Sequence, residues 1–500
     1  MRIKHIIIVV VGLIVLALMA VLVVRLVPKQ DPPVQVFTPT YYPTNGWQTN
    51  TPEEQGVDSL KLAKLLKTIQ KNNLQVNSLI FVRNGVVILD AYFYNPYDGT
   101  FPHDMASVTK SIMTTLIGIA AGQGKIQLDQ PILSYLPNRT IANLDSNKEQ
   151  ITVRHLTGMV NGFESGCMAD DMGTLNQMRS NPDWIQAALD RKMVGEPGKK
   201  FCYDSPGMHL LSAILQESTG MTALEFAQKY LFEPMGIHDV IWESDPQGYT
   251  HGWGDIHLYP QDAAKIGYLF LNNGVWDGQQ VVPADWVAQA VMPHVRAGAD
   301  DYGYGWWVEK NSFGAMGRGG QNIVVFPSQN AIAVTTGGGF DYDQIAPLLT
   351  SIVSDSVNPL PPNPQGVAQL EEVLRNLVKD LPALPGIDTP RTAQEISGNT
   401  YIFETNPVML KWARINFTDP TEMVMDLNLF GANTTWRIGL DGQYRYSPDG
   451  SLQRGYWKDA QTFMVEVFDV GLDTRQFTLT TNQMVVEASG MKILGTLENP

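Results

Sequence analysis

Basic residues are scarce in this chain, and they do not cluster. The 500 residues include 35 Lys and Arg against 50 Asp and Glu, which gives a formal net charge of −15. Because a nucleic-acid-binding surface needs a basic patch, this balance argues against a nucleic-acid partner. Charged residues make up 17% of the chain and hydrophobic residues 44%, which is typical of a globular protein rather than a disordered one.

Cysteine is almost absent. Cys167 and Cys202 are the only two, and no group of histidines lies beside either of them in the sequence. This spacing does not match a metal site. An even pair in an exported protein permits one disulfide, whereas two free thiols in the core are equally compatible with the sequence.

One long stretch without charge stands near the N-terminus. Residues 6–24 are almost entirely aliphatic, and nineteen helical residues nearly cross a hydrocarbon core of about 30 Å. We expect an uncleaved signal-anchor, with a cleaved signal peptide as the alternative; Leu18-Met19-Ala20 is only a weak cleavage site. Basic residues flank both ends, so the positive-inside rule leaves the orientation open. Either reading places the remaining chain outside the cytoplasm, as a single-pass protein of the cell membrane or as a secreted one.

Composition and periodicity divide the chain into parts. Strand patterns lie at both ends of the first large part and helical patterns in its middle, which predicts an α+β domain whose sheet is completed by its last strands. The final part contains only strand patterns separated by turns. We therefore expect an anchor or signal segment at 1–27, a Pro-rich spacer at 28–50, the α+β domain at 51–355, a Pro-rich linker with a short helix at 356–395, and a small all-β domain at 396–500.

Several local signals place element ends. Asp58 is positioned to cap a helix that carries apolar residues at helical spacing, and Thr222 with Glu225 forms a capping box. Asn84-Gly85 between two β-rich runs predicts a hairpin. Gly220 is expected to end a helix that begins near Pro206.

Ser107-Val108-Thr109-Lys110 is the first candidate for chemistry. Serine and lysine three residues apart on a helix lie on the same face. A serine hydroxyl is a weak nucleophile unless a base removes its proton, and a lysine with a lowered pKa is such a base. The bare pattern is weak, since the capping serine of an ordinary helix fits it equally well. Ser489-Gly490-Met491-Lys492 also matches, but it lies among predicted strands, where the same-face argument fails.

Two further segments carry polar groups at the starts of elements. Tyr203-Asp204-Ser205 precedes a predicted helix, and a tyrosine beside a lysine ammonium can act as a base. Gly317-Arg318-Gly319-Gly320-Gln321 leads into a strand, where glycines allow a ligand to approach the backbone and a cation can hold a carboxylate. Taken singly, each is better explained as a core tyrosine or as an ordinary glycine turn.

The three segments together, in this order, resemble the motifs of the penicillin-recognising serine hydrolases. That β-lactamase-related family contains class C β-lactamases, D-alanyl-D-alanine carboxypeptidases, related esterases and 6-aminohexanoate-dimer hydrolases. The resemblance covers about residues 50–355 and implies a β-lactamase/transpeptidase-like fold, with an antiparallel sheet and a helical subdomain. It rests on the amino-acid sequences of five segments: Met105–Ser111, Phe201–Gly207, Phe232–Ile237, Tyr302–Trp307 and Gly319–Gln321.

The resemblance implies a mechanism and site residues. Ser107 would form an acyl-enzyme with a small-molecule ester, amide or peptide, while Lys110 and Tyr203 would share the role of base. The backbone N–H groups of Ser107 and Gln321 would form the oxyanion hole. Ser205 would contact the substrate or relay protons, and Arg318, Gly319 and Gly320 would line its site. The resemblance implies no metal and no organic cofactor.

Two departures from the family's pattern bear on the activity. Ser205 stands where the second motif often has Asn, and Arg318 stands where the third motif usually has Lys or His. Arginine keeps the charge but changes its shape and reach. We therefore expect an esterase- or amidase-like serine hydrolase. A β-lactamase or D-alanyl-D-alanine carboxypeptidase is one alternative, and a non-catalytic membrane-anchored receptor is another.

Histidines and tryptophans outside these motifs are more easily explained as structural. His209, His251, Trp253 and His257 are expected to pack rather than to react. Of the pair Trp306-Trp307, one ring is expected to point inward and the other to line the cleft.

Overall fold

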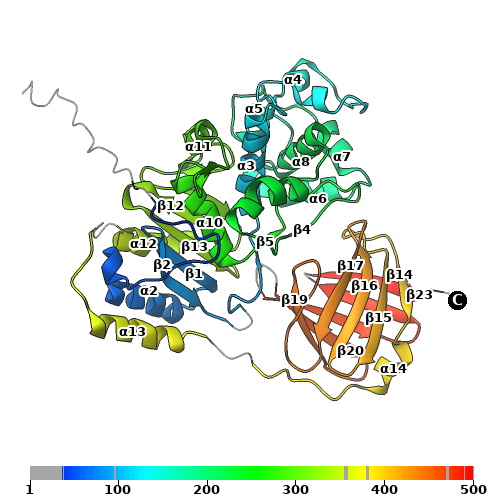
Figure 1. Cartoon of the computed structure of the whole chain (residues 1–500). Coiled ribbons are helices and arrows are strands. Elements are labelled where there is room, and N and C mark those ends of the chain that lie inside the picture. Colours follow the sequence, from blue (N-terminus) through cyan, green and yellow to red (C-terminus); the bar gives the residue numbers. More distant parts are fainter. Residues whose placement is uncertain are drawn as a thin grey trace, which may run out of the picture. The chain divides into compact units, whose positions relative to one another are not determined.

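The computed structural model describes residue 37 and residues 39–94, 97–353, 358–378, 382–468, 472–488 and 490–498 (Figure 1). The expected membrane segment at 6–24 lies outside these residues. Among the residues that are described, no helix is long and apolar enough to cross a membrane.

An eight-stranded antiparallel sheet organises the first large part of the chain. Asn84 and Gly85 both have positive φ, of 51° and 81°, so the predicted hairpin is confirmed. Strand β1 pairs on its other side with β13, so the last strands complete the sheet, as expected. The order is β2 (Val86–Tyr92), β1 (Val76–Arg83), β13 (Ala331–Gly337), β12 (Gln321–Phe326), β11 (Phe313–Gly317), β10 (Trp307–Val308), β9 (Asp300–Tyr302) and β8 (Val295–Ala297).

Alternating side chains of this sheet bury both of its faces. Ile80 and Val82 of β1 join the core beneath α10 (Pro260–Leu271), whereas Leu79 and Phe81 join a second core beneath α2 (Ser59–Lys71). The period-two alternation of a strand produces this division. Helix α13 (Pro364–Arg375) packs on α2 in the same second core, together with α12 (Ala346–Val353).

The helical region lies between β2 and β8 in the chain. Its two longest helices, α3 (Val108–Gly122) and α8 (Ser205–Thr219), contact each other. The predicted caps are confirmed: Asp58 accepts from Leu60, Thr222 and Glu225 form a capping box, and Gly220 ends α8 at φ 72°. The shorter helices are α4 (Ser146–Glu149), α5 (Val153–Thr157), α6 (Cys167–Arg179), α7 (Trp184–Asp190), α9 (Ala223–Ala227) and α11 (Ala284–Ala290).

Short strands brace this region. Strand β5 (Ile256–Leu258) pairs with β3 (His103–Asp104) and β4 (Ile241–Trp242), which anchors the chain just before Ser107. Strands β6 (Val275–Trp276) and β7 (Gln279–Gln280) form a separate hairpin.

The C-terminal residues form an all-β barrel, as the strand patterns predict. Helix α14 (Arg391–Ile396) precedes it, and a pairing of Gly439 with Arg454 joins β17 to β19 in addition to the ten-stranded order. Inward residues such as Ile415, Met425 and Val465 alternate with outward ones and form a core of their own. The strands are β14 (Thr400–Phe403), β15 (Trp412–Asp419), β16 (Glu422–Leu429), β17 (Ala432–Gly439), β18 (Arg445–Tyr446), β19 (Leu452–Trp457), β20 (Thr462–Phe468), β21 (Leu472–Leu479), β22 (Gln483–Ala488) and β23 (Met491–Leu497).

Candidate active site

Ser107 and Lys110 meet at the start of α3. Ser107 is the residue immediately before the helix, so Lys110 lies one turn further along on the same face. The Lys110 Nζ donates to Ser107 Oγ at 2.8 Å and to the backbone oxygen of Trp253 at 2.7 Å. Lys110 is 2% exposed while Ser107 is half-buried. A cation-forming group is therefore held inside the protein against a hydroxyl that ligands can reach.

The backbone around Ser107 is tightly constrained. Ala106 has φ 45°, a left-handed conformation that costs energy for a residue with a side chain. Gly317, at the end of β11, approaches this turn closely. A Cβ at Gly317 would lie 2.7 Å from the Met105 oxygen and 3.0 Å from the Ser107 nitrogen. Only glycine allows the strand to lie so near the nucleophile candidate.

Tyr203 lies beside Lys110. Its ring centroid is 4.8 Å from Lys110 Nζ, and its side chain is buried. The half-buried ring of Trp307 stacks on Tyr203 with centroids 6.3 Å apart, while Trp306 is fully buried, as expected for this pair. Phe201 and Tyr302 pack against Trp307 and extend an aromatic wall beside the three polar groups.

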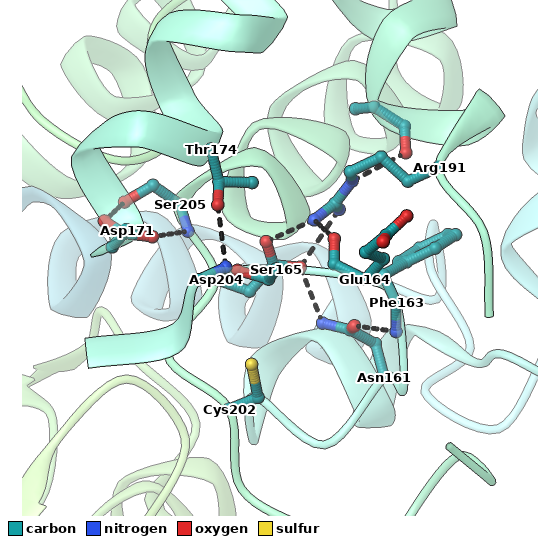
Figure 2. A network of polar contacts seen from close by, with 12 residues as sticks. Asn161, Phe163, Glu164, Ser165, Asp171, Thr174, Arg191, Cys202, Asp204 and Ser205 are labelled. Carbon is teal, nitrogen blue, oxygen red and sulfur yellow. Dashed lines mark hydrogen bonds and ion pairs between the residues drawn. The ribbon is translucent and has the colours of Figure 1, made fainter. Parts of the chain in front are cut away.

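An ion pair fixes the segment that carries Tyr203. The buried Asp204 accepts from Arg191 Nη1 at 2.6 Å and Nη2 at 3.0 Å, and from Asn161 Nδ2 at 3.0 Å. Figure 2 shows these side chains converging on Asp204. A two-pronged guanidinium contact restricts the orientation of a carboxylate. Asp204 therefore positions its neighbours Tyr203 and Ser205 rather than facing a ligand.

Ser205 is paired with Asp171, a residue that the sequence motifs did not indicate. Ser205 Oγ donates to Asp171 Oδ2 at 2.6 Å, and the Ser205 N–H donates to Oδ1 at 2.8 Å (Figure 2). Burial raises the pKa of the Asp171 carboxyl, and the positive charge of Lys110 opposes this rise. Asp171 thus places a carboxylate within the electrostatic range of the Ser107–Lys110 pair.

Cys167 and Cys202 form a disulfide, which decides between the two possibilities left open by the sequence. Cys202 directly precedes Tyr203, and Cys167 begins the helix α6 that carries Asp171. The bridge therefore ties the Asp171 segment to the Tyr203 segment. The two cysteines are the sequence feature that could have linked these two parts of the site, had the disulfide been predicted.

The third predicted segment lies partly apart from Ser107. Arg318 is exposed in the turn between β11 and β12, and Gly320 packs against Phe340. The side chain of Gln321 donates to the oxygen of Gly337 at 2.6 Å, and its Oε1 accepts from the Gly337 N–H. The oxygen of Gly319 accepts from the N–H of Gly339. Of this stretch, Gly317 lies within contact range of Ser107, since a Cβ at Gly317 would lie 3.0 Å from the Ser107 nitrogen.

The four other candidates pack, as expected. His209 is fully buried with Nε2 3.0 Å from Asp245 Oδ2, and burial lowers the pKa of this imidazole. His251 stacks on Trp253, and its Nδ1 forms a hydrogen bond with Asp255 Oδ2. His257 is buried on β5. Trp253 nevertheless contributes to the site through its backbone oxygen, which the side-chain pattern could not reveal.

Comparison with known proteins finds a matching family and a relative. The family described as Beta-lactamase matches residues 62–344. The chain is 23% identical over 307 residues to the 6-aminohexanoate-dimer hydrolase of Paenarthrobacter ureafaciens, covering 57% of this chain and 78% of that protein.

Comparison with solved structures gives two further matches. A Bacteroides dorei protein assigned as a beta-lactamase superposes with a TM-score of 0.50 at 17% identity, over 59% of this chain and 99% of that one. The octameric penicillin-binding protein homologue from Pyrococcus abyssi has a TM-score of 0.46 at 16% identity, over 87% and 99%.

Proposed function

Because the chain belongs to the beta-lactamase family and is a serine hydrolase of that family, we propose that it cleaves an ester or amide bond through an acyl-enzyme on Ser107. The observation that carries this proposal is the 2.8 Å contact between the buried Lys110 Nζ and Ser107 Oγ, beside the ring of Tyr203.

The proton path follows from this geometry. With its amine neutral, Lys110 accepts the Ser107 proton as Oγ attacks the substrate carbonyl carbon. Tyr203, whose ring lies beside Lys110, gives its phenol proton to the leaving alcohol or amine and is reprotonated by the Lys110 ammonium. Water then attacks the acyl carbon while Lys110 takes a proton from it, and this proton passes to Ser107 Oγ as the acid leaves.

The oxyanion hole in this proposal differs from the one that the motif alignment implies. The Ser107 N–H at the start of α3 supplies one donor. Since Gly317 lies beside the Ser107 nitrogen, the N–H of the next residue, Arg318, is the favoured second donor in place of that of Gln321.

The charges around Ser107 favour neutral or cationic substrates over β-lactams. Arg318, which stands where the family's third motif usually has Lys or His, is exposed in the turn between β11 and β12. Asp171 adds a carboxylate near Lys110. A substrate carboxylate, which both β-lactams and D-alanyl-D-alanine peptides carry, would therefore meet a solvated cation rather than a buried one. The aromatic wall of Phe201, Tyr302 and Trp307 suits an apolar acyl or alcohol group.

A substrate panel tests this proposal. Purified protein is assayed with p-nitrophenyl butyrate, a p-nitroanilide of the same acid, a chromogenic cephalosporin and a D-alanyl-D-alanine peptide. We expect the ester, and more slowly the anilide, to be cleaved by the wild type and not by Ser107→Ala. Turnover of the cephalosporin or the peptide at a higher kcat/KM than the ester would contradict the assignment and support the alternatives.

We also propose that the catalytic domain works outside the cytoplasm, anchored by residues 6–24. The uncharged stretch and the Cys167–Cys202 disulfide support this location, because disulfides persist in oxidising compartments. Membrane fractionation and external protease digestion of intact cells test it. We expect membrane-bound protein whose catalytic domain is digested from outside, and protein recovered in the cytosol would contradict the proposal.

A further inference from the structure

A cavity of about 210 Å³ lies within the C-terminal barrel. Its walls come from the inward faces of β15, β16, β17, β21, β22 and β23 and from the loop before β15. They are almost wholly apolar, with two charged exceptions, Asp473 and Arg475 on β21. The lining residues are Val408, Leu410, Ala413, Met425, Leu427, Leu429, Phe430, Trp436, Asp473, Arg475, Phe477, Met484, Val486, Ala488, Met491 and Ile493.

The sequence leaves this space unfilled while it fills other parts of the barrel interior. Trp457, Phe463 and Phe417 pack ring against ring and do not line the cavity. At the cavity, the inward positions 413 and 488 carry alanine, and Met425, Met484 and Met491 provide flexible side chains that adapt to varied shapes. Protein interiors are normally close-packed, so a void of this size is unusual for a purely structural core.

Arg475 supplies a charged group at this apolar site. Its guanidinium lies 4.7 Å from the ring centroid of Trp436. Its Nε is 3.6 Å from Asp473 Oδ2, which is longer than a hydrogen bond. Within the described part of the chain, the Arg475 side chain has no hydrogen-bond acceptor, although three quarters of it is buried. A guanidinium held by an aromatic ring and lacking an acceptor has the geometry to take a carboxylate with two hydrogen bonds.

We propose that the barrel binds an amphipathic carboxylic acid, with its alkyl chain in the cavity and its carboxylate on Arg475. An engineered cavity of about 150 Å³ holds benzene, so the present volume fits a chain of roughly six to eight carbons. This site is separate from Ser107 and its ligand need not be a substrate. The inference therefore stands independently of the proposed hydrolysis.

Isothermal titration calorimetry of the full-length protein with octanoic acid tests the site, with octanol and octylamine as comparisons. We expect one octanoic acid per chain and weaker binding of the other two. Ala413→Leu fills the cavity and should abolish measurable binding. Arg475→Gln should weaken octanoic acid by roughly tenfold, as expected for a lost charge-assisted contact, and leave octanol unchanged. Arg391→Gln, on the exposed α14, is the matched control and should bind like the wild type.

A second measurement separates a lost site from a misfolded barrel. Octanoic acid should raise the Tm of the wild type and of Arg391→Gln but not of Ala413→Leu, whose own Tm without ligand should equal or exceed that of the wild type. Ala488→Leu fills the same cavity from another strand and should behave likewise. The proposal is overturned if octanoic acid does not saturate the wild type, if both filled variants still bind it, or if octanol binds as tightly as the acid.

Discussion

The pattern Ser-x-x-Lys occurs twice in this chain, in two different physical settings. At 107–110 it starts a helix, Lys110 is 2% exposed, and its Nζ contacts Ser107 Oγ at 2.8 Å. At 489–492 the lysine belongs to β23. The Lys492 side chain is 70% exposed and its Nζ pairs with Glu487 at 2.7 Å. Ser489 lies outside the described residues. The Ser-x-x-Lys spacing therefore indicates a nucleophile and its base only where a helix brings the two side chains together and burial excludes water from them.

Replacing the serine is expected to have the largest effect, and to affect the two patterns differently. Ser107→Ala should lower kcat for an activated ester by on the order of 10⁴-fold or more, as removal of a serine nucleophile does elsewhere. Ser489→Ala should leave kcat unchanged. Steady-state assays of both variants with p-nitrophenyl butyrate check this. Equal kcat values for the wild type and Ser107→Ala would show that Ser107 is not the nucleophile.

Loss of the lysine is expected to come next. Lys110→Met keeps the length of the side chain but removes the base, and should lower kcat roughly 10²–10⁴-fold. Lys492→Met breaks only an exposed ion pair and should change the free energy of unfolding by less than about 1 kcal/mol. The same ester assay, with urea unfolding monitored by circular dichroism, measures both. A catalytic defect in Lys492→Met would show that the second pattern also matters.

The site around Ser107 and Lys110 includes a buried ion pair, Arg191 with Asp204, and its removal can be tested. Arg191→Met leaves the buried Asp204 without its guanidinium and should lower the free energy of unfolding by about 3 kcal/mol, as for other broken buried pairs. Adding Asp204→Asn should recover part of this loss. The exposed pair of Arg391 and Glu395 provides the control, since Arg391→Met should cost less than about 1 kcal/mol. Equal urea midpoints for the two single variants would contradict this account.

Burial of ionisable groups predicts a smaller, pH-dependent effect. Burial, with a contribution from His257, lowers the pKa of His103 to about 3. The unfolded chain therefore binds this proton at a higher pH than the folded one, so stability falls as the pH drops from about 6.5 towards 3.

In that interval, His103 contributes about 1.4 kcal/mol per pH unit. His103→Gln can keep a hydrogen bond to Thr336 without titrating and should reduce the slope by this amount. Urea unfolding at a series of pH values measures the slope. An unchanged slope would mean that His103 is protonated in the folded protein.

Features that depend on neighbouring residues were predictable from the sequence. The Asn84-Gly85 hairpin, the Thr222 capping box and the contact of Ser107 with Lys110 each arise within a few residues, where φ preferences and helical spacing act directly. The completion of the sheet by its last strands also followed, because strand patterns lie at both ends of the domain and β1 pairs with β13.

Features that depend on distant residues were not predictable. Asp171 reaches Ser205 from 34 positions away, and the Trp253 oxygen reaches Lys110 from 143 positions away. Nothing in the local pattern of either residue indicates a contact. Gly317 belonged to the third predicted segment, but no motif assigned it a place beside the nucleophile candidate, where the fold puts it. Only the folded backbone shows which glycine of this segment lies beside Ser107.

Intact-mass spectrometry after treatment with a fluorophosphonate tests the central claim most directly. The reagent adds one phosphonyl group to an activated serine, and peptide mapping locates it. The account predicts a single adduct on Ser107 in the wild type and in Ser489→Ala, and none in Ser107→Ala or Lys110→Met. Folded wild-type protein that remains unlabelled, or an adduct that persists in Ser107→Ala, would contradict the claim that Ser107 is the activated nucleophile.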